Sequence, residues 1–423
     1  MNIWLITVGE PLPTDDDNSR LYRTGILAKM LNRKGHKVTW WTSNVNHVTK
    51  RQRYLDDKTI HLHDNYQIKL IHSVNYRKNV SLSRIFNHYF TARKFSKMVL
   101  DELEPDIILC SLPTLSLSMK AVKYGKKRGI PVVLDIRDLW PDIFLNIFPG
   151  WAEMGMKFIL SPAFKMAYTA CKDATAIMGI TSAFVEWGQM LGDRQHTDID
   201  RDFPLAYSEK IPSQDLICKA REFWEEKGIN NKNGEFIACF FGTMGRQFDL
   251  EPVIKVAKTF QSVNKNIKLV LCGSGDNLKY YKDLASDCSN IIFPGWVQAH
   301  HIWTLMKLSS VGLAPYYSSN DFMKSYPNKS IEYLSAGLPI VSSLKGLLQE
   351  LLESNSCGIT YENGNAEQLA EILTRLYEEP ETLKKMSENA LSLYRERFVA
   401  EKVYSDMIDH LELICSEYNK GGE

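Results

Sequence analysis

The chain lacks the features that mark a metal site, a secreted protein or a membrane span. Its 423 residues include eight cysteines, all scattered singly, so neither a zinc site nor a disulfide framework is expected and a reducing cytoplasm fits best. The N-terminus has no basic leader, and no apolar run reaches about 18 residues, so neither a signal peptide nor a transmembrane helix is expected. The net charge of +1 gives the whole molecule no strong attraction to nucleic acid.

Two further features that the sequence lacks limit the kinds of protein it can encode. No short tandem repeat or low-complexity tract is found, and no Gly-x-Gly-x-x-Gly follows the first apolar run, where "TVGEPLP" stands instead. A dinucleotide-dependent dehydrogenase is therefore disfavoured. The hydrophobic fraction of 44% and the charged fraction of 24% are typical of a globular protein, and the length allows two or three domains.

Short apolar runs alternate with helical patterns along both halves of the chain, which predicts an α/β fold with parallel sheets. The expected strands of the first half are 3–8, 37–43, 68–73, 106–112, 132–138 and 175–180. Those of the second half are 236–242, 267–275, 290–296, 311–316 and 338–343. A polar, irregular stretch with one charged helix separates the halves, so we place a domain boundary near residue 205. Two Rossmann-like sheets would bind ligands at their strand carboxyl ends, in a cleft between them.

The stretch "YPNKSIEYLSAGLP" (326–339) predicts a helix of about two turns, with Asn328 as N-cap and Gly337 as stop. Lys329 and Glu332 lie three residues apart and so point to the same side. One interpretation is a weak surface ion pair. The other is a ligand with a phosphate and a diol, in which Lys329 and the helix start hold the anion and Glu332 accepts two ribose hydroxyls.

Glycine-rich turns follow the strands of the second half. In "FGTMGRQFDLEP", Gly242 and Gly245 permit a tight turn around Thr243 with exposed amides, and Arg246 offers a forked contact to phosphate. The alternative is an ordinary βα turn. In "CGSGDN", Gly273 and its neighbour two residues on favour close packing of strand and helix.

A third turn, in "FPGWVQAHHIW", brings Trp296 and Val297 to a place where their backbone could hydrogen-bond a flat base. A turn without a ligand role is the alternative.

Polar residues also gather at strand ends in the first half. Asp135, Arg137 and Asp138 of "LDIRDLWPDIF" follow a strand and could hold sugar hydroxyls or a charged leaving group, or simply pair with one another. Arg20 and Arg23 belong to a long polar loop after the first strand, from which they could approach phosphate oxygens.

Two segments interleave aromatic and basic residues. Residues 76–98 place Leu82, Ile85, Phe86, Tyr89 and Phe90 on one helical face, with Arg84 and His88 opposite, and 143–168 add Trp151 and Phe158 with lysines. Either these helices pack on their own sheet, or they meet anionic lipid or an acceptor with a long hydrocarbon chain.

Together, "FGTMGR", "FPGWV", "YPNKSIEYLSAGLPIV", "GHKVTWWTS" and "DIRDLWP" resemble bacterial glycosyltransferases of the GT-B fold, family 4, in the branch that builds O-antigen and capsular polysaccharide. The resemblance covers nearly the whole chain. It implies an acceptor-binding domain at 1–204, a nucleotide-sugar donor domain at 205–394 and a final helix, 395–423, that crosses back to the first domain.

The resemblance also implies an activity: transfer of a sugar, with retention, from a nucleotide-diphosphate sugar and without metal or cofactor. The expected donor is UDP-linked. The expected acceptor is lipid-linked, such as a polyprenyl-diphosphate glycan, or a saccharide. The protein is then cytoplasmic and peripheral to the inner membrane, with no nucleic-acid partner.

Individual roles follow by the same resemblance. Glu332 matches the ribose-binding glutamate, and Gly242, Gly245, Arg246 and Lys329 match the pyrophosphate cradle. Trp296 and Val297 match the base-binding turn, and Asp138 the polar residue near the transferred sugar.

The chain departs from the family pattern in two ways. The usual Arg and Lys of the phosphate loop are not at their standard spacing, so Arg246 serves there and Lys329 shares its role. The family often carries a second glutamate eight residues before the first, where this chain has Lys324. Two alternatives therefore stay open: a UDP-sugar 2-epimerase of similar shape, and a non-catalytic nucleotide-sugar-binding assembly protein.

Overall fold

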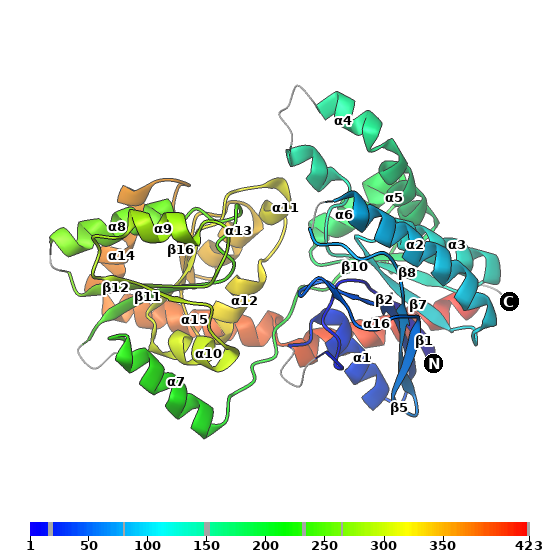
Figure 1. Cartoon of the computed structure of the whole chain (residues 1–423), viewed down its shortest axis with the longest axis horizontal. Coiled ribbons are helices and arrows are strands. Elements are labelled where there is room, and N and C mark those ends of the chain that lie inside the picture. The colour runs from blue at the N-terminus through cyan, green and yellow to red at the C-terminus, as the bar shows by residue number, and fades with distance from the viewer. Residues whose placement is uncertain (16–19, 79–80, 148–152, 231–233, 264, 421–423) are drawn as a thin grey trace. The chain divides into compact units, whose positions relative to one another are not determined.

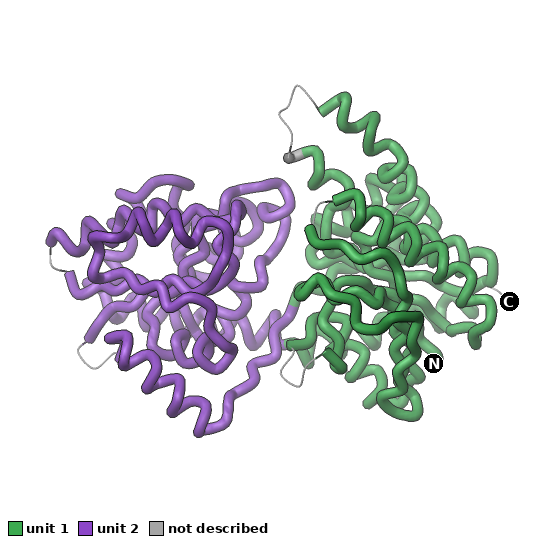
Figure 2. Tube along the Cα trace, in the orientation of Figure 1, with its two compact units in different colours: residues 1–205, 400–423 green, residues 206–399 purple. Residues whose placement is uncertain are grey.

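The computed structural model describes residues 1–15, 20–78, 81–147, 153–230, 234–263 and 265–420. The chain forms two compact units, one of Met1–Leu205 with Ala400–Glu423 and one of Ala206–Val399 (Figure 2). Each unit is an α/β body with its own sheet, which confirms the predicted pair of Rossmann-like parallel-sheet domains. Among the described residues, no helix combines the length and the hydropathy needed to cross a bilayer.

The first unit has an eight-stranded sheet in the order β10-β9-β8-β7-β1-β2-β6-β5, parallel except where β5 pairs antiparallel with β6. Its central strands are almost fully buried, as their apolar sequences require for a sheet covered on both faces. The strands are β1 (Asn2–Ile6), β2 (Lys37–Ser43), β5 (Lys58–His63), β6 (Tyr66–Ile71), β7 (Ile107–Leu112), β8 (Val132–Ile136), β9 (Ala176–Gly179) and β10 (Arg201–Asp202), beside a small hairpin of β3 (Val45–Asn46) and β4 (Arg51–Gln52).

Helices cover both faces of this sheet (Figure 1). One layer holds α2, α3 and α5 in successive contact, and the other holds α1 against α16. Under the first layer, the rings of Trp4, Trp41 and Phe95 pack edge to face at centroid distances of 5.3–6.5 Å. The helices of this unit are α1 (Arg23–Arg33), α2 (Leu82–Met98), η1 (Val99–Asp101), α3 (Leu115–Arg128), η2 (Asp142–Ile147), α4 (Glu153–Ile159), α5 (Ser161–Asp173), α6 (Ser182–Gly192) and α16 (Ala400–Lys420).

The second unit has a fully parallel six-stranded sheet in the order β13-β12-β11-β14-β15-β16. Its strands are β11 (Phe236–Phe241), β12 (Ile267–Cys272), β13 (Ile291–Gly295), β14 (Val311–Ala314), β15 (Ile340–Ser342) and β16 (Gly358–Thr360). Its helices are α7 (Gln214–Glu226), α8 (Glu251–Ser262), α9 (Leu278–Leu284), α10 (Ala299–Leu308), α11 (Asn320–Met323), α12 (Asn328–Ser335), α13 (Leu347–Ser354), α14 (Ala366–Glu378) and α15 (Pro380–Arg397).

Strand order locates the position where each sheet can bind a ligand. In the second unit the chain runs outward from β11 through β12 to β13 and then restarts beside β11 with β14. The first unit does the same, from β1 to β2 and β6 and then back to β7 beside β1. In open α/β sheets, ligands usually bind at the carboxyl ends of the two strands between which the order reverses. These strands are β11 and β14 in one unit and β1 and β7 in the other.

Candidate functional site

Three glycines line up across adjacent strand ends of the second unit. The Gly242 amide donates to the Cys272 carbonyl at 3.0 Å, and the Gly273 amide donates to the Gly295 carbonyl at 2.7 Å. A Cβ atom on Gly273 would lie 1.8 Å from the Gly242 carbonyl oxygen, and both residues have φ values, +141° and +151°, that favour glycine. The strand ends after β11, β12 and β13 therefore present bare backbone.

The loop after β11 is pinned to the loop after β12. The buried Met244 donates its amide to the Ser274 carbonyl at 2.8 Å, and a Cβ on Gly275 would lie 2.6 Å from the Met244 oxygen. Gly273 and Gly275 thus allow two loops to meet, whereas the sequence predicted close packing of a strand on a helix. The pinned loop leaves Thr243 and Arg246 exposed.

Lys329 lies in the first turn of α12, against this bare backbone. Its Nζ is 4.5 Å from the ring centroid of Phe248 and 5.4 Å from that of Phe240. A Cβ on Gly242 would come within 2.2 Å of that nitrogen, so the absence of a side chain there makes room for the ammonium. The structure gives Lys329 no hydrogen bond or ion pair with any residue it describes. Burial lowers the pKa of Lys329 to about 8, although the charge of Glu332 acts in the opposite direction.

Glu332 follows one turn later and is buried, with 9% of its surface exposed. Its charge helps to raise the pKa of Tyr316, which burial raises most. Within the described chain no ion pair joins Glu332 to Lys329, so the interpretation of the two residues as a surface ion pair is wrong. Both residues belong to α12, and the Lys329 side chain lies beside Gly242.

The boundaries of α12 differ from the prediction at one end. The helix begins at Asn328 with Pro327 at the N-cap position, so the predicted N-cap role of Asn328 is wrong and no side chain caps the first turn. The other end is as predicted, because Gly337 takes φ +72° and donates to the Leu334 carbonyl at 3.0 Å. The uncapped first amides remain available to an anion.

Three more residues were predicted to bind the donor, namely Trp296, Val297 and Arg246. Trp296 follows β13 with 72% of its surface exposed, whereas Val297 is buried. Arg246 forms no ion pair within the part of the chain that the structure describes. Lys324, in place of the family's second glutamate, directly follows the short helix α11. The predicted base contact of Trp296 and Val297 stays a prediction.

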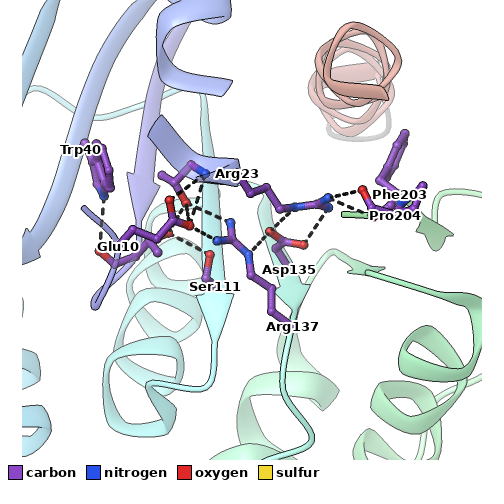
Figure 3. A network of polar contacts seen from close by, with 10 residues as sticks. Glu10, Arg23, Trp40, Ser111, Asp135, Arg137, Phe203 and Pro204 are labelled. Atoms are coloured by element: carbon purple, nitrogen blue, oxygen red, sulfur yellow. Dashed lines mark hydrogen bonds and ion pairs between the residues drawn. The ribbon is translucent and has the colours of Figure 1, made fainter. Parts of the chain in front are cut away.

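The first unit contains a separate network of buried charges at the carboxyl ends of β1 and β8 (Figure 3). Arg23 donates Nε and Nη2 to the two carboxylate oxygens of Asp135, both at 3.0 Å, and Nη1 to the carbonyls of Phe203 and Pro204. The two charged side chains are 1% and 0% exposed. Because these two side chains are inaccessible to a substrate, the structure does not support their predicted contact with the acceptor. Their hydrogen bonds instead connect α1, β8 and residues 203–204.

Arg137 completes the network from the other side. It donates Nε to Asp135 at 2.6 Å, Nη1 to Glu10 and Nη2 to the Thr24 hydroxyl at 3.0 Å. Burial alone would raise the pKa of Asp135, but the charges of Arg137 and Arg23 hold that pKa below its ordinary value. Two arginines and two carboxylates thus balance one another inside the unit.

Glu10 is a member of this network that sequence reasoning missed. It also accepts from the Thr24 amide at 3.1 Å and from the Thr24 hydroxyl at 2.8 Å, which orients the start of α1. Its only signal in the sequence is its place just after the first strand. Arg20 and Asp138 are exposed instead, so they stay candidates for substrate contact.

The apolar face of α2 points away from the sheet, contrary to the prediction that this face packs on it. Leu82, Ile85 and Phe86 of α2 are 54–73% exposed, while Asn87 and His88 on the other face are buried. The prediction that the apolar face packs on its own sheet is therefore wrong. Phe158 of α4 is 84% exposed. Trp151, predicted to join it, lies outside the described residues.

Comparison with known proteins shows what the chain is similar to, beginning with the second unit. Residues 222–393 match the family model described as glycosyl transferases group 1. An uncharacterized glycosyltransferase of Methanocaldococcus jannaschii is 27% identical over 155 residues, which cover 35% of this chain and only 38% of that relative.

Two solved structures align over almost the whole chain. Anabaena HepE in complex with UDP has a TM-score of 0.66 at 13% identity, covering 97% of this chain and all of its own. Sucrose-phosphate synthase from Thermosynechococcus elongatus has a TM-score of 0.69 at 15% identity, covering 98% and 99%. Residues 222–393 thus match the glycosyl transferases group 1, and the chain has the GT-B fold.

Proposed function

We propose that the protein is a retaining glycosyltransferase that moves a sugar from a nucleotide-diphosphate sugar, UDP-linked, to a lipid-linked or saccharide acceptor. The observation that carries the proposal is Lys329. A half-buried ammonium that rests on two aromatic rings and bare glycine backbone, with no anion of the described residues bonded to it, is arranged for an anionic ligand.

The residues around Lys329 match the parts of such a donor. The diphosphate binds at Lys329, the amides at the start of α12 and the backbone at Gly242, and Arg246 adds a second, exposed cation. Glu332, one helical turn after Lys329 on α12, accepts hydrogen bonds from the two ribose hydroxyls. The base stacks or hydrogen-bonds at Trp296 and Val297. The UDP seen in the HepE complex, a structure of the same fold, supports the nucleotide part of this assignment.

The reaction then needs stabilisation of the leaving diphosphate above all. The bond between the sugar C1 and the diphosphate oxygen breaks, and the negative charge that develops is met by Lys329, Arg246 and the helix amides. The acceptor hydroxyl forms its bond to C1 on the same face and gives its proton to the departing phosphate. Asp138 orients the sugar or the acceptor. Because these cations can neutralise the leaving group, we propose that transfer requires no metal, which activity in EDTA would support.

The acceptor side is proposed from the surface of the first unit. Exposed apolar side chains on α2 and α4 include Phe86 and Phe158, and the exposed basic residues Arg77 and Lys78 precede α2. Apolar and basic side chains together suit the headgroup region of an anionic bilayer. We propose that the protein works at the inner face of the cytoplasmic membrane, on a polyprenyl-diphosphate glycan, in the assembly of O-antigen or capsular polysaccharide.

The test is nucleotide release from a panel of UDP-sugars, with and without lipid-linked glycan acceptors. A glycosyltransferase releases UDP rapidly only with the right acceptor, and Lys329→Met should reduce that release at least a hundredfold. Epimerisation of the donor without any acceptor would identify a UDP-sugar 2-epimerase. Tight donor binding with no turnover for any acceptor would identify an assembly protein without activity, the alternative that Lys324 keeps open.

A further inference from the structure

A second cluster of charged and aromatic side chains lies at the carboxyl edge of the first sheet, outside the network of Figure 3. Its members come from three segments. His47 and Lys50 belong to the turn between β3 and β4, Tyr76 and Arg84 to the stretch from β6 into α2, and Trp140 to the loop after β8. None of the roles proposed above uses these residues.

The rings of Tyr76 and Trp140 hold the two cations. The Lys50 Nζ lies 5.3 Å and the Arg84 Cζ 5.9 Å from the ring centroid of Tyr76, and Arg84 lies 4.9 Å from that of Trp140. The His47 Nδ1 is 2.7 Å from the Tyr76 hydroxyl and 3.4 Å from the Lys50 ammonium. An ammonium can only donate, so this nitrogen accepts and His47 is neutral.

The backbone of Lys50 is in a conformation that lysine rarely adopts. Its φ of +59° is left-handed, and it is held by a bond from its amide to the Asn46 carbonyl at 2.9 Å and one from the Asn75 side chain to its own carbonyl at 3.1 Å. Glycine or asparagine would adopt this conformation with less strain than lysine does. Strain at a charged residue beside other charges is a feature of functional sites.

The pKa values of the cluster show that its cations act on one another. Burial and then the charge of Arg84 lower the pKa of Lys50, and burial with both cations lowers the pKa of His47 to about 4. Asp138 is the opposing charge that acts on Arg84. Arg53, whose charge also reaches Tyr76, is bonded to Asp15. The cluster therefore brings two half-buried cations together on aromatic rings, and the exposed carboxylate of Asp138 acts on one of them.

We propose that Lys50 and Arg84, on the walls formed by Tyr76 and Trp140, are a phosphate- or diphosphate-binding subsite of the first unit. A bound anion would relieve the repulsion between the two cations and gain charge-assisted hydrogen bonds from both. The forked guanidinium of Arg84 suits two phosphate oxygens at once, and Lys50 adds a point charge. Resting on the proposed function, this subsite receives the phosphate that links the acceptor glycan to its carrier, next to Asp138.

The subsite can be measured directly in the full-length chain. We would titrate inorganic pyrophosphate and farnesyl diphosphate by calorimetry into the Lys329→Met protein, because that background removes the competing anion site in the second unit. Lys50→Asn removes a charge and suits the left-handed backbone, and Arg84→Gln keeps most of the packing on Trp140. The matched control is Arg93→Gln, an exposed arginine on the same helix.

We expect Lys50→Asn and Arg84→Gln each to weaken pyrophosphate binding about tenfold, as loss of one charge-assisted contact predicts, and Arg93→Gln to leave it unchanged. Tighter binding of farnesyl diphosphate than of pyrophosphate would add a lipid-attached source for the anion, and equal binding would support recognition of the phosphates alone. Unchanged affinity in both variants, or an equal loss in Arg93→Gln, would overturn the subsite.

Separate UDP titrations of the protein with Lys329 intact keep the two proposals distinguishable. If UDP does not bind while pyrophosphate still requires Lys50 and Arg84, the subsite stands and the proposed function falls. If UDP binds with normal affinity while pyrophosphate ignores both residues, the subsite alone falls. Hydrogen exchange in peptides of β1 and α1 that matches the wild type shows that the first unit of each variant is folded.

Discussion

At the scale of single residues, the charge of Lys329 gives the proposed donor site a pH dependence. Its pKa of about 8 is below the ordinary value for lysine, so the ammonium exists below pH 8 and is lost as pH rises through that value. UDP affinity should therefore be about tenfold weaker at pH 9 than at pH 7. The measurement is UDP binding by calorimetry across this range.

The control for that profile is Lys329→Arg, whose guanidinium stays charged throughout. Its UDP affinity should be nearly flat between pH 7 and pH 9, and because the ligand titrates identically with both proteins, the difference reports residue 329. A wild-type profile as flat as that of the arginine variant would contradict the assignment.

A substitution at Gly242 tests whether the proposed donor site needs bare backbone beside Lys329. In Gly242→Ala the new methyl group would overlap the Lys329 ammonium, which lies 2.2 Å from that position, so UDP affinity should fall at least tenfold. Gly364→Ala is the matched control, because its φ of +78° is equally unsuited to alanine but nothing lies within 4 Å of the added Cβ. Both variants should lose about 1 kcal/mol of stability, and only the first should lose UDP binding. Equal UDP affinities would show that Lys329 does not need this space.

Single-residue chemistry was predictable from sequence only where a motif fixes the spacing. Lys329 and Glu332 share one short helix, so their common side followed from helical geometry alone. Arg23 and Asp135 are 112 positions apart, and nothing local indicates that they bury each other. Glu10 enters the same network through residues at positions 24 and 137. Strand ends thus predict that polar residues gather, whereas only the fold decides which are neutralised within the protein.

At the scale of elements, strand prediction succeeded where burial is complete. β2 has the predicted bounds, and the other predicted strands fall within two residues of theirs except β12, which ends three residues early, because a buried strand is a continuous apolar run. The strands that were missed are the sheet-edge strands β5, β10 and β16 and the small hairpin of β3 and β4. β5 is only half-buried and β10 has two exposed residues, so neither carries the apolar signal. The direction in which α2 faces was also unpredictable, since periodicity defines two faces without saying which one is buried.

The outward apolar face of α2 leads to a prediction about membranes. Phe86, 54% exposed and stacked on Phe90 at 6.5 Å, should insert at the surface of an anionic bilayer. Phe86→Ser should at least halve the fraction of protein that co-sediments with phosphatidylglycerol vesicles, without lowering the melting temperature, because the side chain packs on no core.

Leu103→Ser provides the comparison for this element. Leu103 is 67% exposed but lies outside α2 and α4, so its replacement should leave vesicle binding as in the wild type. If both variants lose binding to the same degree, general surface hydrophobicity is responsible. If neither does, the face has another role.

At the scale of the whole molecule, the chain leaves the first unit at residue 205 and returns to it at residue 400. The returning helix, α16, packs against α1, where Lys34 contacts Asp409 and Glu412 at 2.7 Å each. His410 further bonds the Ile199 carbonyl at 3.0 Å. The first unit is therefore completed by a segment that follows the second unit in the chain, so its stability depends on residues almost 200 positions beyond its own boundary.

Two leucines on α16 test this dependence. Leu411 is fully buried, whereas Leu413, two positions on, is 47% exposed. Leu411→Ala should destabilise the first unit by about 2–5 kcal/mol, because it removes a buried side chain and leaves a cavity, and Leu413→Ala should cost less than about 0.5 kcal/mol. Hydrogen exchange should show faster exchange in peptides of β1 and α1 for the Leu411 variant alone, with the peptides of β11 and β12 unchanged. If exchange instead accelerated equally in both units, the two would unfold as one cooperative body, and α16 would stabilise the molecule as a whole.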